Sequence, residues 1–161
     1  MKNWAIYIVI ALAVVAYNAA TQADRDGSGA IVGEGAVDAF NIRLGDCFDD
    51  SSTSFGDGSQ QVNDLPGVPC AEPHDNEVYA VINLTLPEFP EGDTIGEVAF
   101  DTCMTKFDTF VGKDYDSSSL DILTLYPTRD SWNQLNDREV VCAVYDMNSA
   151  KLSGSAQGLA L

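Results

Sequence analysis

Basic residues are scarce in this chain of 161 amino acids. It has 8 lysines and arginines against 25 aspartates and glutamates. Lys2 comes before the first acidic residue, so the rest of the chain has 7 basic and 25 acidic residues and a net charge of −18. A surface this negative repels phosphate backbones and anionic lipid headgroups, which excludes nucleic acid as a partner. The charge favours solubility, and it could also attract cations or a basic partner.

Signatures of a catalytic or metal centre are missing as well. The chain has no Gly-x-Ser-x-Gly segment, the motif that exposes a serine nucleophile in one large class of hydrolases. Structural zinc sites use closely spaced cysteine pairs, whereas no two cysteines here lie within about twenty residues of each other. The only histidine is His74, and one histidine cannot build a multi-histidine metal site. We therefore expect no cofactor, no resident metal and no enzymatic activity.

The chain has one long apolar run, which follows Lys2 and extends from Trp4 to Ala20 without a charge. A membrane-spanning helix needs about 20 largely apolar residues, with roughly 17 as a lower limit. A basic start and an acidic continuation place the N-terminus inside the cell and the body outside. Residues 1–23 are therefore predicted to be a signal anchor and transmembrane helix. The alternative is a signal peptide cleaved near Ala23, which would leave the body secreted.

Residues 24–40 are rich in glycine, alanine and acids, which predicts a flexible acidic linker. Within this segment Asp24, Asp26 and Ser28 match ligand positions one, three and five of an EF-hand calcium loop. Position twelve of such a loop should be a glutamate, and here it is Gly35. We favour the linker, and a calcium-responsive module stays an alternative function.

Residues 41–161 are predicted to form one small α+β domain. Alternating apolar residues along 78–86 indicate a half-buried strand, and an apolar stripe along 94–111, followed by Gly112, indicates an amphipathic helix. The other expected strands are 41–48, 120–126, 138–145 and 151–161, with loops at 49–67 and 128–137. This order predicts a small antiparallel sheet with one main helix packed on it.

All four cysteines follow the apolar run, at positions Cys47, Cys70, Cys103 and Cys142. An even number of cysteines in an exported chain indicates disulfides, because oxidising compartments preserve them. Four cysteines allow three connectivities, and we favour the one that pairs Cys47 with Cys70 and Cys103 with Cys142. Cys47–Cys70 would tie the opening strand to the segment after the polar loop, and Cys103–Cys142 would pin the helix to the last long strand. In the chain-entropy model each bond contributes about 3 to 4 kcal/mol.

The surroundings of His74 are the first candidate site. Glu72, Pro73 and Glu77 lie close to it in the sequence. A histidine beside carboxylates can act as a general base, so a secreted or anchored hydrolase stays an alternative function. No nucleophile accompanies it, however. We favour a structural role, in which Pro73 fixes a turn and the histidine bonds backbone groups where the loop enters the strand.

A second candidate site contains Trp132, Asp137 and Arg138, in the segment predicted as the last loop. A tryptophan in a loop can present a contact surface to a partner. We favour a packed indole, with Asp137 and Arg138 bonded to each other or to nearby backbone.

These motifs together resemble the septum formation family of Gram-positive, actinobacterial type, a group of membrane-tethered extracytoplasmic domains. The most specific match is Cys70-Ala-Glu-Pro-His-Asp-Asn-Glu-Val78, and Gly45-Asp-Cys-Phe48 and Asp137-Arg-Glu-Val-Val-Cys142 extend it. In that family a glycine usually precedes the Asp-Arg pair, where this chain has Asn136. The resemblance covers residues 42–158 and implies a role in cell division without established catalytic residues. We therefore expect a non-catalytic, membrane-anchored domain that contacts cell-envelope or division components.

Overall fold

The computed structural model describes residues 22–50, 61–91 and 94–161. Most of the predicted anchor, residues 1–21, and part of the predicted polar loop, residues 51–60, lie outside the described residues. No helix within the described part of the chain is long and apolar enough to cross a membrane. The membrane segment therefore stays a prediction from the sequence.

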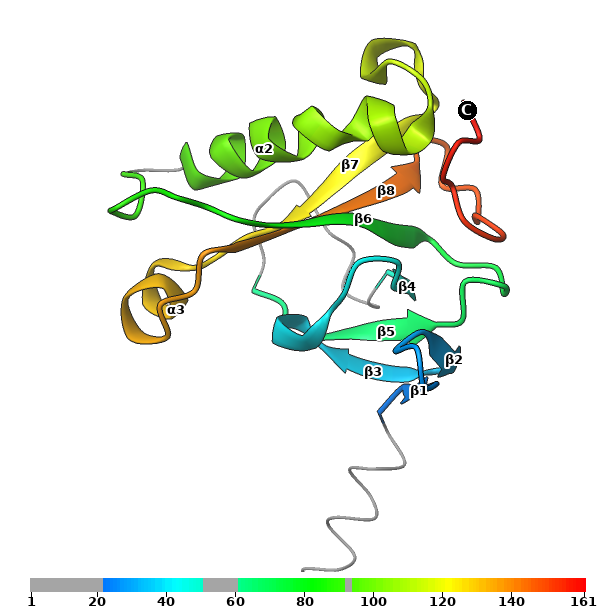
Figure 1. The fold of residues 1–161 in the computed structure, drawn as a ribbon, viewed down its shortest axis with the longest axis horizontal. Helices are drawn as coiled ribbons and strands as arrows, with labels where there is room; N and C mark the ends of the chain where they lie inside the picture. The colour runs from blue at the N-terminus through cyan, green and yellow to red at the C-terminus, as the bar shows by residue number, and fades with distance from the viewer. Residues whose placement is uncertain (1–21, 51–60, 92–93) are drawn as a thin grey trace, which may run out of the picture.

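Six antiparallel strands form the main sheet, in the order β3-β5-β4-β6-β8-β7 (Figure 1). Their bounds are β3 Gly35–Asp38, β4 Cys47–Phe48, β5 Asp64–Val68, β6 Asn76–Asn83, β7 Leu120–Leu125 and β8 Glu139–Asp146. The two longest strands, β6 and β8, pair with each other, with Val81 opposite Val141. The sheet therefore joins an N-terminal part, made of β3, β4 and β5, to a C-terminal part that contains β7 and β8.

The main helix, α2 (Thr94–Val111), lies across one face of this sheet (Figure 1). Every fourth residue of the helix is buried, and these residues are Ile95, Ala99, Cys103, Phe107 and Val111. Gly112 ends the helix with φ 82°, a left-handed conformation that costs glycine little. The predicted helix and its position on an antiparallel sheet are confirmed.

The centre of the sheet is buried on both faces. Along β8, Val140, Cys142 and Val144 pack in a cluster beneath α2, whereas Val141 and Ala143 belong to a second cluster on the opposite face. The second cluster is completed by residues from the N-terminal half of the chain, namely Ile31, Val37, Ile42, Phe48, Leu65 and Val78. Burial on both faces explains why β8 is apolar almost without interruption instead of alternating.

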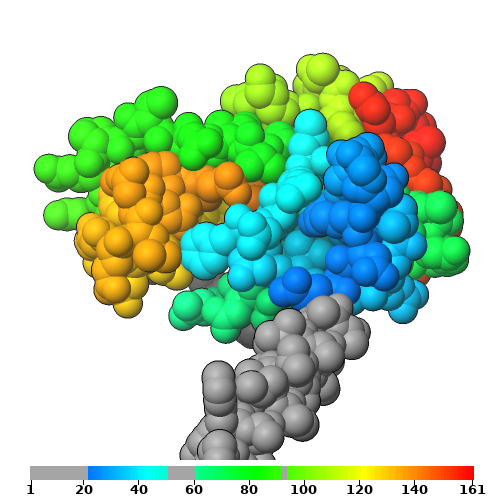
Figure 2. Space-filling view, turned by 60° about the horizontal axis from the view of Figure 1, so that its bottom comes forward, coloured from blue at the N-terminus to red at the C-terminus, as the bar shows by residue number. Residues whose placement is uncertain are grey.

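The segment predicted as a flexible linker, residues 24–40, differs in the structure. It forms β1 (Asp24–Arg25), β2 (Ile31–Gly33), β3 and the 3-10 helix η1 (Ala39–Asn41). Figure 2 shows these N-terminal strands, in blue, packed as part of the body. Their apolar residues are few, but they pair with other strands and enter the second cluster. Glycine also permits close contact there, since a side chain at Gly35 would overlap the backbone of Gln22 and Ala23.

Three further elements depart from the predicted outline. β5 begins within the expected polar loop 49–67, and the short helix α3 (Arg129–Gln134) lies within the expected loop 128–137. The 3-10 helix η2 (Tyr115–Ser117) precedes β7. In the C-terminal segment, where a strand was predicted, Leu152 makes one isolated β-bridge to His74. Nonlocal pairing decides β5 and the bridge of Leu152, and local periodicity does not report it. In contrast, α3 begins with a local capping box between Thr128 and Ser131.

Candidate functional site

Both predicted disulfides are present. Cys47 on β4 bonds Cys70, and Cys103 on α2 bonds Cys142 on β8, with Cα–Cα distances of 5.2 and 5.5 Å. No cysteine is free. The first bond ties the N-terminal part of the sheet to the turn before β6, and the second fixes the helix onto the sheet.

His74 is fully buried between the Cys70 turn and the C-terminal segment. Its backbone N–H donates to the Leu152 carbonyl at 3.0 Å, and the Leu152 N–H donates back at 2.8 Å. In the ring, Nδ1 lies 2.8 Å from the Glu72 carbonyl, so Nδ1 carries the proton and donates it. The other nitrogen, Nε2, is buried and has no hydrogen-bond partner among the described residues. These contacts agree with the predicted bonding of His74 to backbone groups.

Glu77 is also buried, at 3% exposure, and it holds the C-terminal segment. Its carboxylate accepts hydrogen bonds from the Ser155 hydroxyl at 2.6 Å and from the Ala156 N–H at 2.5 Å. The Gly154 N–H donates to the Cys70 carbonyl at 2.9 Å. In contrast, the residues Glu72 and Pro73 are exposed. The motif therefore fastens the end of the chain to the beginning of β6.

The fold brings a third potential ligand to His74 and Glu77. Cys47 lies opposite Glu77 in the pairing of β4 with β6. One donor atom from each of Cys47, His74 and Glu77 lies within 4.8 Å of the other two, and among the described residues this is the only such group of three. Sequence reasoning linked His74 with Glu77 but missed Cys47, because only strand register brings this cysteine to them.

A partly buried ion pair that sequence reasoning missed connects the N-terminal strands to the body. Arg25 donates to both carboxylate oxygens of Asp46, at 2.6 and 2.7 Å, and the Arg43 N–H donates to the same carboxylate at 2.8 Å. Asp46 is 2% exposed. The pKa of Arg25 is raised, mainly by its hydrogen bonds to Asp46. No local motif marks a pair 21 residues apart.

The candidate calcium residues form a turn between β1 and β2. Asp26 Oδ1 accepts hydrogen bonds from the Ser28 N–H at 2.8 Å, the Ser28 hydroxyl at 2.6 Å and the Ala30 N–H at 3.2 Å. The hydrogen bond from the Ser28 hydroxyl is the main cause of a lowered pKa of Asp26. Asp24 lies on β1 and pairs with Gly33 on β2. This oxygen of Asp26 therefore closes a hairpin, which is a structural role.

Trp132 lies on α3 and is 3% exposed. The guanidinium of Arg138 lies 3.6 Å from the centre of an indole ring, and its Nη1 donates to the carbonyls of Trp132 and Asp137 at 3.0 and 2.7 Å. The Asp137 carboxylate accepts from the Ser131 hydroxyl at 2.9 Å. Asn136 precedes this group with φ 55°, a conformation that asparagine tolerates better than most residues. The indole is packed, as the sequence favoured.

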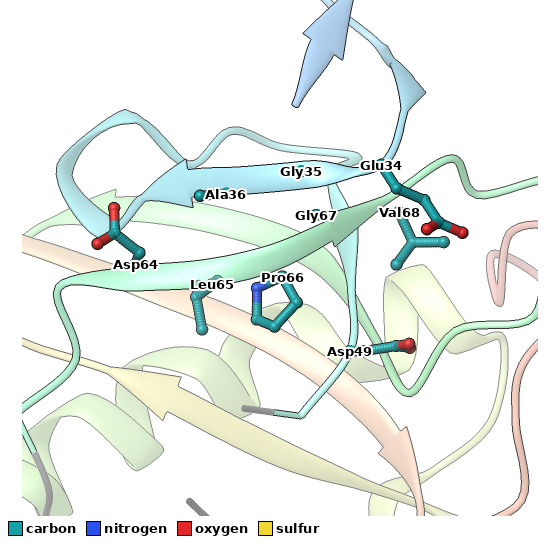
Figure 3. A pocket seen from close by; sticks show the side chains of 9 residues that line it. All are labelled: Glu34, Gly35, Ala36, Asp49, Asp64, Leu65, Pro66, Gly67 and Val68. Atoms are coloured by element: carbon teal, nitrogen blue, oxygen red, sulfur yellow. The ribbon is translucent and has the colours of Figure 1, made fainter. Parts of the chain in front are cut away.

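A groove of about 550 Å³ runs along β3 and β5 (Figure 3). Leu65, Pro66 and Val68 contribute apolar surface, and the carboxylates of Glu34, Asp49 and Asp64 lie around them. Asp49 is engaged by Lys151 at 2.7 Å. Among the residues that the structure describes, those lining the groove include no histidine, cysteine or serine.

One family model, described as Septum formation, matches residues 44–160. The matched range contains both disulfides, α2 and the C-terminal segment, whereas β1, β2 and β3 precede it. Comparison with curated proteins and with solved structures finds no match.

Proposed function

Since this chain belongs to the septum formation family, whose description points to a division-related role, we propose that it is a non-catalytic, membrane-anchored domain. In this proposal residues 1–23 are the anchor, and the body stands on the extracytoplasmic side and contacts cell-envelope or division proteins. The family match, over residues 44–160, includes every motif on which the resemblance rests.

The burial of His74 is the observation that carries the non-catalytic part of the proposal. A general base must come within hydrogen-bond reach of its substrate, directly or through one water. His74 is fully buried, its Nδ1 is engaged by Glu72, and its backbone is bridged to Leu152. These contacts support a scaffold role for the motif and leave the hydrolase alternative without an accessible base.

The disulfides and the charge support the proposed extracytoplasmic location of the body. All four cysteines are paired, as is usual for domains of oxidising compartments. The acidic body repels the anionic surface of a membrane, so a domain of this charge stands clear of the bilayer to which its N-terminus is attached. Contact with a partner then depends on the exposed surface of the folded body.

Localisation and cross-linking of the full chain test the proposal. A fluorescent fusion suited to the outside of the cell should concentrate at division sites, and extracellular protease should remove the body from intact cells. A matched control replaces residues 1–23 with a cleavable signal peptide, and this form should be released into the medium. The proposal would be contradicted if extracellular protease left the body intact. It would also be contradicted if the fusion were evenly distributed and formed no cross-link to an envelope or division protein.

A further inference from the structure

The Cys47–His74–Glu77 group has the composition of a metal site, but one ligand is occupied by a covalent bond. Cys47, His74 and Glu77 are at most 3% exposed, and their donor atoms lie within 4.8 Å of one another. Three elements of the fold hold them there: β4, the turn that follows Cys70, and the first residues of β6. In the disulfide-bonded chain the Cys47 sulfur is bonded to Cys70 and cannot act as a thiolate.

The second observation is the unpartnered nitrogen of the histidine. Because Nδ1 donates to the Glu72 carbonyl, Nε2 is the ring nitrogen left to bind a metal ion. This atom is fully buried and has no hydrogen-bond partner in the part of the chain that the structure describes. Buried polar atoms without partners are rare, and a metal ion is one recognised explanation. A backbone carbonyl that orients the far nitrogen is also the usual support of a metal-binding histidine.

We propose that reduction of the Cys47–Cys70 disulfide converts this group into a Zn²⁺ site, with Cys47 Sγ, His74 Nε2 and the Glu77 carboxylate as ligands. A dithiol reductant supplies two electrons to the S–S bond and becomes a disulfide, while Cys47 and Cys70 become thiols. Zinc then binds the Cys47 thiolate, and the thiol proton passes to solvent. The inference concerns the reduced chain in any compartment, so it does not depend on the proposed function.

The donor set and the distances fit zinc. Thiolate, imidazole and carboxylate are its usual protein ligands, and bonds of about 2.0 to 2.3 Å place neighbouring donor atoms roughly 3.3 to 3.8 Å apart. The donor atoms lie within 4.8 Å of one another, so they need to approach by at most about 1.5 Å, and opening the disulfide frees Cys47 to do so. The Cys70 thiol, released beside it, is available as a fourth ligand.

The two disulfides differ in the access that a reductant has to them. Cys103 and Cys142 are both fully buried, whereas Cys70 is only half-buried, on the turn that carries the motif. Attack on a disulfide requires access to one of its sulfurs. A thiolate therefore attacks Cys70 and releases Cys47, the buried sulfur that lies beside His74 and Glu77.

Zinc content of the full chain tests the inference. The protein is reduced with a phosphine, which does not compete for zinc as a dithiol does, and is then dialysed against zinc and analysed for bound metal. The reduced chain should bind one zinc per molecule and the unreduced chain none. Cobalt in place of zinc should give a thiolate-to-metal absorption band only after reduction.

Matched variants separate this site from nonspecific binding by cysteines. Glu77→Gln and His74→Asn should lower zinc affinity by at least about tenfold, whereas Glu72→Gln, which changes an exposed carboxylate of the same turn, should not. A chain unfolded by reduction would bind zinc through its cysteines, but then the three variants would bind alike. Equal zinc binding by the three variants would overturn the inference. Zinc binding by the unreduced chain would also overturn it, and so would the absence of zinc binding after reduction.

Discussion

At the scale of single residues, His74 shows how a residue that suggests catalysis can serve the fold. Its backbone bridges Leu152, its Nδ1 donates to Glu72, and its ring fills the space between the Cys70 turn and the C-terminal segment. The neighbouring Glu77 holds the same segment through Ser155 and Ala156. Loss of either side chain should therefore mainly lower the free energy of unfolding.

We expect His74→Ala to lower the free energy of unfolding by about 2 to 4 kcal/mol, because it leaves a cavity and removes a buried hydrogen bond. Urea unfolding followed by circular dichroism measures the change. Glu72→Ala is the matched control and should change stability by no more than about 0.5 kcal/mol, since its carboxylate is exposed. A stable His74→Ala protein that had lost a hydrolytic activity would instead favour the hydrolase alternative.

At the scale of elements, the N-terminal strands belong to the folded domain. β3 pairs with β5 at one edge of the main sheet, and β1 pairs with β2. Ile31 and Val37 are buried in the second apolar cluster, and Arg25 neutralises the buried carboxylate of Asp46. The family match begins at residue 44, so these strands are a part of the fold that the family model does not include.

Two truncations test whether residues 22–40 are part of the folded domain or a flexible linker. Removal of residues 1–21 should leave the unfolding midpoint in urea unchanged. Removal of residues 1–40 should lower stability by at least about 3 kcal/mol, because it exposes the second cluster and leaves Asp46 buried without its cation. Equal midpoints for the two truncated proteins would mean that residues 22–40 are a linker after all.

At the scale of the whole molecule, the dominant feature is negative charge. The chain has a formal net charge of −17, and the described ion pairs use Arg25 and Lys151. Self-repulsion of this size opposes the compact state, and added salt screens it. The two disulfides offset this repulsion, because each of them lowers the entropy of the unfolded chain and so favours the folded state.

We expect the melting temperature to rise by roughly 2 to 8 °C when sodium chloride is raised from about 0.01 to 1 M, which shortens the Debye length from about 30 to 3 Å. Differential scanning calorimetry of the oxidised protein measures the shift. An uncharged osmolyte at the same osmolality is the control and should produce a smaller rise. Equal rises in both solutions would show that the charge does not limit stability.

The sequence by itself determined the elements whose signal is local. The apolar stripe along 94–111 specified α2, and the apolar runs specified the cores of β6, β7 and β8. The cysteine number predicted two disulfides, and the pairing that we favoured among three possible connectivities is the one that the structure has. Periodicity and cysteine number depend only on the chain's own order of residues, so they can be read before any contact is known.

Only the tertiary structure decided which distant residues meet. β1, β2, β3 and β5 are short and rich in glycine or acids, and they exist because another strand pairs with them. Arg25 forms an ion pair with Asp46, and Cys47 lies beside His74 and Glu77. Strand register and the path of the chain produce these contacts, and no sequence motif encodes them. The buried Nε2 of His74 likewise follows from closure by the C-terminal segment. These contacts are stabilised by nonlocal strand pairing and by burial, and the local composition of the sequence does not predict either.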